Sequence, residues 1–115
     1  MKQETITVDG QQYPVIFTLA TISNFEEITG KPFFSSNLDM VKNRIAIILA
    51  AAIAADENTT LTVDALRGKE DWDAYRHIAE EYAVVMQLAS EFFHVPEAAK
   101  DKDAPQQPEG EPAKN

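Results

Sequence analysis

The chain has 115 residues, 44% of them hydrophobic and 25% charged, which is enough for one domain with a single core. Its 19 acidic and 10 basic side chains leave a formal net charge of -9, which repels nucleic acid and anionic membranes and excludes both as expected partners. The absence of cysteine excludes disulfides, thiolate zinc sites and a cysteine nucleophile.

Neither a secretory signal nor a membrane span is expected. The amino-terminal residues MKQETITVDG contain no apolar run of the kind that a signal peptide requires. The longest nearly apolar run, Ile45 to Ala55, is shorter than the roughly 20 residues that a membrane-spanning helix needs. The sequence therefore predicts a cytoplasmic protein.

A β-hairpin is predicted over residues 5–17. Two β-prone runs flank Asp9-Gly10, a pair that tolerates the positive φ of a tight turn. Pro14 lacks a backbone donor, so the second strand either lies at a sheet edge or begins at Val15. An isolated hairpin is marginal in water, and we expect helices to cover one of its faces.

The apolar spacing then changes to that of a helix over residues 18–29. Thr18 is the expected N-cap and Gly30 the expected end, and the predicted buried stripe consists of Leu19, Ile22, Phe25 and Ile28. Phe33 and Phe34 follow in a connecting segment. Two adjacent aromatic residues in a loop either fill the core or form a contact patch, and we expect at least one to be buried.

A second helix is predicted over residues 37–55, with Ser36 or Asn37 as its cap. From Ile45 onward it is apolar nearly all the way round, so more than one neighbour must cover it. This helix is either the central element of the domain or meets another subunit. We expect exposed apolar surface here and near Phe33 and Phe34, and the candidate partner-binding residues on the helix are Ile45, Ile48, Leu49 and Ile53.

A short helix over residues 62–67, capped by Thr62 and ended by Gly68, precedes a long helix over residues 71–94. The apolar stripe of the long helix is Trp72, Tyr75, Ile78, Tyr82, Val85, Met86, Ala89, Phe92 and Phe93. Trp72, near its start, either covers the core or contacts a partner, and it completes the candidate binding set.

Residues 96–115 have a composition unlike the rest of the chain. They are rich in Pro, Glu, Asp, Lys and Gln, and alanine is their only apolar type, so a disordered tail is predicted. The predicted fold is therefore mainly α with an N-terminal β-hairpin (α+β), in one domain over residues 1–95.

One helix face could carry chemistry, because Asp73, His77, Glu80 and Glu81 recur at helical spacing. A His and carboxylates on one helix resemble part of a metal site, but such sites need further carboxylates from other helices. The same residues, with Arg76, lie opposite Tyr75, where a solvated charged face is expected. No catalytic residue, cofactor or metal is therefore predicted, and the protein is not expected to be an enzyme.

The order of elements resembles the tail assembly chaperones of long-tailed bacteriophages. The resemblance lies in the hairpin, the helix ending in Phe25-Glu26-Glu27-Ile28-Thr29-Gly30-Lys31, the alanine-rich helix, the motif Leu61-Thr62-Val63-Asp64-Ala65-Leu66, and the final helix with its polar tail. It implies a protein that binds the tape measure protein, keeps its apolar helices soluble and helps to recruit tail tube subunits.

The resemblance also implies that a longer form of the protein is made by ribosomal frameshifting. The last residues, Ala113-Lys114-Asn115, can be encoded by a run of adenines of the slippery kind. Apolar faces beyond the needs of one core, together with net negative charge, fit a chaperone that can also self-associate as a homo-oligomer. The alternative is a small bacterial adaptor or regulatory binding module with another partner.

Overall fold

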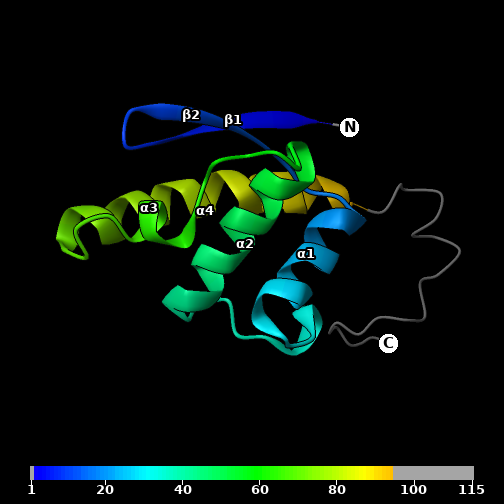
Figure 1. Ribbon diagram of the computed structural model, residues 1–115. Coiled ribbons are helices and arrows are strands. Elements are labelled where there is room, and N and C mark those ends of the chain that lie inside the picture. Colours follow the sequence, from blue (N-terminus) through cyan, green and yellow to red (C-terminus); the bar gives the residue numbers. More distant parts are fainter. Residues whose placement is uncertain (1, 95–115) are drawn as a thin grey trace, which may run out of the picture.

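A computed structural model describes residues 2–94 and shows an N-terminal hairpin followed by helices, which confirms the predicted α+β class (Figure 1). The predicted disordered tail, residues 96–115, lies outside the described residues. The elements in chain order are β1 (Gln3–Val8), β2 (Gln11–Ile16), α1 (Leu19–Thr29), the 3-10 helix η1 (Phe33–Ser35), α2 (Val41–Ala55), α3 (Val63–Arg67) and α4 (Trp72–Phe92).

The hairpin has the predicted two-residue turn. Asp9 and Gly10 adopt φ values of 52° and 77°, and β1 pairs with β2 antiparallel in a two-stranded sheet. Pro14 lies opposite Thr5, and counting pairs from the turn puts it at a position that makes no ladder hydrogen bonds. The strand therefore runs through Pro14, and a start at Val15 is wrong.

Local capping sets the bounds of α1 as predicted. Thr18 and Thr21 form a reciprocal capping box, and Gly30 ends the helix with a φ of 71°. The predicted stripe was wrong at Leu19 and Ile28, which are exposed, whereas Thr21 is buried beside Ile22 and Phe25. At about 100° per residue, Leu19 lies roughly 120° around the helix from Phe25 and so faces away from the core.

Helix α2 begins at Val41, four residues later than predicted. The Asn37 side chain does not cap it, because its Oδ1 accepts from the backbone N–H of Asp39 at 2.9 Å and closes a separate turn. The Asn43 side-chain amide donates to the Asn37 carbonyl at 2.8 Å and holds that turn against the helix. Met40 is the N-cap instead, and its side chain offers no oxygen to the first turn.

Helix α2 is the central element of the domain, the first of the two alternatives raised by its apolar sequence. It contacts α1, α3, α4 and β2. Small residues such as Ala50 permit close approach, and the Asn24 side chain of α1 donates to the Ala50 carbonyl at 3.3 Å. The expected exposed apolar face is therefore wrong at Ile45 and Ile48, which are buried by these neighbours.

Thr62 caps α3 by accepting from the Ala65 N–H at 3.1 Å, and Asp71 caps α4 by accepting from the Ala74 N–H at 3.0 Å.

Figure 1 shows that the hairpin lies along α4 and that α2 crosses α4. The middle of the α4 stripe is buried at Ile78, Val85 and Ala89. Both ends of that stripe are exposed, contrary to prediction, because the packed elements cover the middle of α4; the exposed residues are Trp72, Tyr75, Phe92 and Phe93.

Candidate functional site: protein-binding surfaces

The charged face of α4 forms ion pairs along the helix. Arg76 lies between Asp73, at 3.2 Å, and Glu80, at 3.4 Å, and His77 Nδ1 lies 3.4 Å from Glu80 Oε1. These pairs have the three- and four-residue spacing of a solvated helix face. Within residues 2–94 no group of three or more possible ligand side chains is placed to hold a metal ion.

Glu81 departs from that solvated face, where the sequence had placed it. Its side chain is 7% exposed, and its Oε1 has no hydrogen-bond partner. Burial, with smaller effects from the Glu80 and Asp9 carboxylates, raises the pKa of Glu81 to about 7. Together with Asp9, His77 and Gly68, Glu81 lines a cavity of about 240 Å³ between the hairpin turn and the α3–α4 connection.

Three phenylalanines gather at the carboxyl end of α4, and we call Phe34, Phe92 and Phe93 the phenylalanine patch. Phe92 and Phe93 contact the buried Phe17 ring at centroid distances of 5.4 and 5.7 Å. Phe34 lies 6.0 Å from Phe93 and 5.0 Å from Phe33. The patch is thus the outer layer of an aromatic cluster whose inner rings belong to the core.

The outer rings of this patch remain in contact with solvent. Phe34 is 74% exposed, and Phe92 and Phe93 are 41% and 44% exposed. Contiguous exposed aromatic surface is uncommon on a folded domain and marks contact sites, where aromatic side chains bury the most area. The phenylalanine patch is therefore the best candidate surface for an apolar partner.

A second exposed aromatic site lies at the opposite end of α4. Trp72 is 71% exposed and stacks on Tyr75 with a centroid distance of 5.4 Å and an interplanar angle of 25°. Each ring therefore shields one face of the other from water. Because it is far along α4 from the phenylalanine patch, this pair serves as a comparison site of similar exposure.

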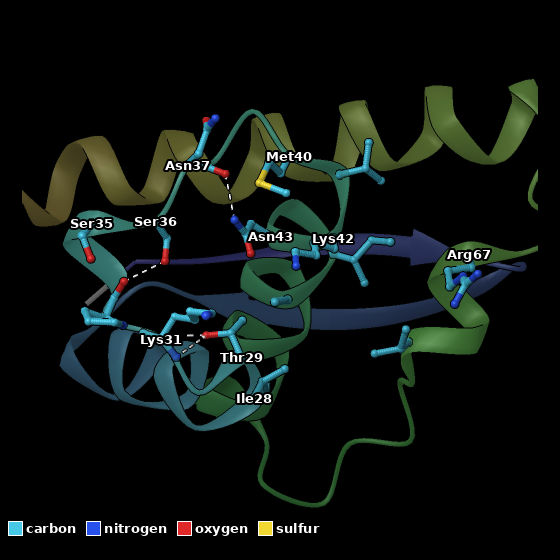
Figure 2. A pocket seen from close by; sticks show the side chains of 15 residues that line it. Ile28, Thr29, Lys31, Ser35, Ser36, Asn37, Met40, Lys42, Asn43 and Arg67 are labelled. Atoms are coloured by element: carbon cyan, nitrogen blue, oxygen red, sulfur yellow. Dashed lines mark hydrogen bonds between the residues drawn. The ribbon is translucent and has the colours of Figure 1, made fainter.

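A groove of about 820 Å³ lies between the end of α1, the segment that follows it, the first half of α2, and α3 (Figure 2). Ile28, Met40, Val41 and Val63 give it an exposed apolar lining. Its charged residues are all basic: Lys31, Lys42 and Arg67. The described part of the chain thus has two separate apolar surfaces besides the Trp72–Tyr75 pair.

The structure separates the predicted binding residues into three groups. Phe34 and Trp72 are exposed, Leu49 and Ile53 are half-buried, and the remaining three are buried, namely Phe33, Ile45 and Ile48. The burial of Phe33 confirms that one phenylalanine of the pair fills the core. Ile45 also lines the groove. The other half-buried and buried candidates do not line it, namely Phe33, Ile48, Leu49 and Ile53.

Sequence reasoning missed Phe92 and Phe93 as surface residues and missed the groove. The adjacent pair Phe92-Phe93 did indicate that one ring would be exposed, because two adjacent residues differ by about 100° around a helix and rarely face one neighbour equally. The groove had no such signal, since its lining comes from α1, α2, α3 and the segments between them.

Comparisons of the chain with protein-family models, with curated proteins and with solved structures found no match. Among the described helices, none has the length and apolar character needed to cross a membrane.

Proposed function

We propose that this protein is a non-enzymatic assembly chaperone that binds an apolar helical segment of a client protein. The observation that carries the proposal is the phenylalanine patch, which holds three exposed aromatic rings over a buried aromatic layer. Rigid aromatic side chains on a packed base lose little conformational freedom when they contact a partner. Such a surface suits a client that presents apolar side chains.

The proposed client is the tape measure protein of a bacteriophage tail, and tail tube subunits would be recruited to the same complex. This assignment comes from the resemblance in the order of elements to tail assembly chaperones. The formal net charge of -9 supports it, because like-charged complexes repel one another and stay dispersed while apolar segments are covered. The proposed place of action is the host cytoplasm, before the tail is complete.

A second candidate function is a small bacterial adaptor that binds one defined partner. The observation that favours it is the groove, whose basic side chains give it a chemical preference that a general holder of apolar helices does not need. The genes beside this one distinguish the two functions, because a tail chaperone gene is expected to have a tape measure gene as its neighbour.

Co-expression with the neighbouring tape measure gene tests the chaperone function. We expect the full chain to raise the soluble fraction of that protein and to co-purify with it. Substituting Phe34→Ser and Phe93→Ser together should reduce both effects, because it removes two exposed rings from the patch. Trp72→Ser is the matched control, since Trp72 is as exposed as Phe34 but lies at the other end of α4.

Circular dichroism and thermal unfolding of each variant establish that any loss reflects the surface and not the fold. The chaperone proposal is rejected if the wild-type chain leaves the solubility of the tape measure protein unchanged and does not co-purify with it. The role of the patch is rejected if the Trp72 variant loses as much binding as the double phenylalanine variant.

A further inference from the structure

The walls of the groove restrict what it can bind. Its lining comes from helices and from the segments between them, and neither strand of the hairpin contributes a residue. An added β-strand needs an exposed sheet edge, so an extended peptide has no backbone ladder to join here. A helix needs only apolar holes for side chains at i, i+3 or i+4 and i+7, and a groove of about 820 Å³ can hold several such side chains.

Three neutral polar side chains of the groove bond to other groove residues, as the dashed lines in Figure 2 show. The Thr29 hydroxyl accepts from the Lys31 N–H at 3.1 Å, and the Ser36 hydroxyl donates to the Pro32 carbonyl at 2.7 Å. The Asn43 amide is held by its bond to the Asn37 carbonyl. With these three side chains engaged, the groove offers a ligand mainly apolar surface and positive charge.

The charge of the groove is opposite to that of the whole chain. Three of its lining residues are basic and none is acidic, although the chain carries 19 acidic and 10 basic side chains. In Figure 2 Lys31 and Arg67 lie on opposite sides of the groove, with Lys42 between them. Arg67 pairs with Glu70, but Lys31 and Lys42 form no ion pair within residues 2–94.

The amino end of α2 adds to this positive potential. Met40 caps the helix without a side-chain hydrogen bond, and no acidic residue occurs in the first turn. No carboxylate of α2 itself therefore offsets the partial positive charge of the helix end, and Asp39, just before the cap, pairs with Arg44 at 3.3 Å. Met40, Val41 and Lys42 all line the groove, so the apolar lining and the helix end lie together.

We propose that this groove binds an amphipathic helix of a partner protein, with an apolar face that enters the groove and Asp or Glu side chains on its flanks. Charge complementarity selects this occupant over a basic helix, and the net charge of -9 opposes nucleic acid. Residues 95–115 of this chain do not supply the occupant, because Val95 and alanines are their only apolar residues. None of the phenylalanine patch residues lines the groove, so this site is separate from the surface that carries the chaperone proposal, and it specifies the kind of partner that the second candidate function would bind.

The test uses two designed helical peptides with the same leucine face, one flanked by glutamates and the other by lysines. Their affinities for the full-length chain are measured by fluorescence anisotropy at low and high salt. We expect the glutamate peptide to bind more tightly and to weaken as salt rises, because exposed charge pairs are screened. Lys42→Glu should weaken its binding roughly three- to tenfold, since an attraction becomes a repulsion.

Lys69→Glu is the matched control, because it makes the same charge change at an exposed residue outside the groove. It should change the affinity by less than about twofold. The proposal is overturned if the lysine peptide binds as tightly as the glutamate peptide, or if both charge reversals weaken binding equally. The Phe34→Ser and Phe93→Ser variant should retain peptide binding; if it loses binding, the peptide contacts the patch and the groove is not its site.

Discussion

The buried carboxyl group of Glu81 makes the stability of this domain depend on pH. Its pKa of about 7 in the folded chain lies above the ordinary value of 4.5, because burial disfavours the charged form. The folded chain therefore holds this proton more tightly than the unfolded chain does. The resulting stabilisation is full below the unfolded pKa and is lost as pH rises through the folded pKa.

Glu81→Gln tests this consequence at a single residue. At about pH 8 we expect the variant to be more stable than the wild type by roughly 1 to 3 kcal/mol, because no buried charge has to form. At about pH 4.5 the difference should be small or reversed. Urea unfolding across this range measures it, and Glu57→Gln, at an exposed residue, is the control. A wild-type stability that rises between these two pH values while the variant's stays flat would contradict the assignment to Glu81.

At the scale of the element, α2 combines a central position in the domain with a first turn that has no side-chain cap. Its buried residues lie between positions 43 and 52 and the helix contacts four neighbouring elements, so its stability comes mainly from packing. Its first turn lacks the side-chain cap that α1, α3 and α4 all have. The same turn lines the groove, so the part of α2 that has no side-chain cap belongs to a candidate binding surface.

Met40→Ser should strengthen this first turn. Met40 already has the extended backbone of an N-cap, with φ of -78° and ψ of 131°, so a serine hydroxyl there can accept from the first turn. We expect a gain of about 1 kcal/mol in the free energy of unfolding relative to Met40→Ala, the control that removes the same thioether without adding a cap. Chemical denaturation of the two variants compares them directly. Equal stabilities would show that the first turn of α2 gains nothing from a side-chain oxygen.

At the scale of the whole molecule, net charge and exposed apolar surface oppose each other. The charge of -9 keeps copies apart, whereas the phenylalanine patch favours contact between apolar surfaces. Raising the salt concentration screens the repulsion without weakening apolar contact. The balance between dispersed single chains and a homo-oligomer should therefore shift with ionic strength.

Sedimentation velocity tests this balance. Between about 0.05 M and about 0.5 M salt we expect the full chain to associate increasingly, because the Debye length falls from roughly 14 Å to roughly 4 Å. The Phe34→Ser and Phe93→Ser variant should associate less at high salt, and Trp72→Ser should behave like the wild type. Association that decreases with salt would mean that charge pairs, and not the phenylalanine patch, hold the copies together.

Sequence by itself determined the local structure of this protein. The Asp9-Gly10 turn, the Thr18 cap and the Gly30 end follow from short-range hydrogen bonds and from which residues tolerate positive φ. The caps of α3 and α4 at Thr62 and Asp71 have the same origin, although Asp71 was expected only as the start of its helix. Where a competing local bond was available, at Asn37, the predicted helix start failed.

Only the tertiary structure decided which apolar residues are covered. Periodicity shows that α2 carries more apolar surface than one neighbour can bury and that α4 has one apolar stripe, but not where the neighbours cross. Tertiary packing covers Ile48 and leaves Phe34 exposed. It also buries the carboxyl group of Glu81, which the helical spacing had placed in solvent. The groove likewise exists only because α1, α2 and α3 bring together residues distant in sequence. Burial depends on these long-range contacts, whereas the elements themselves depend on neighbouring residues.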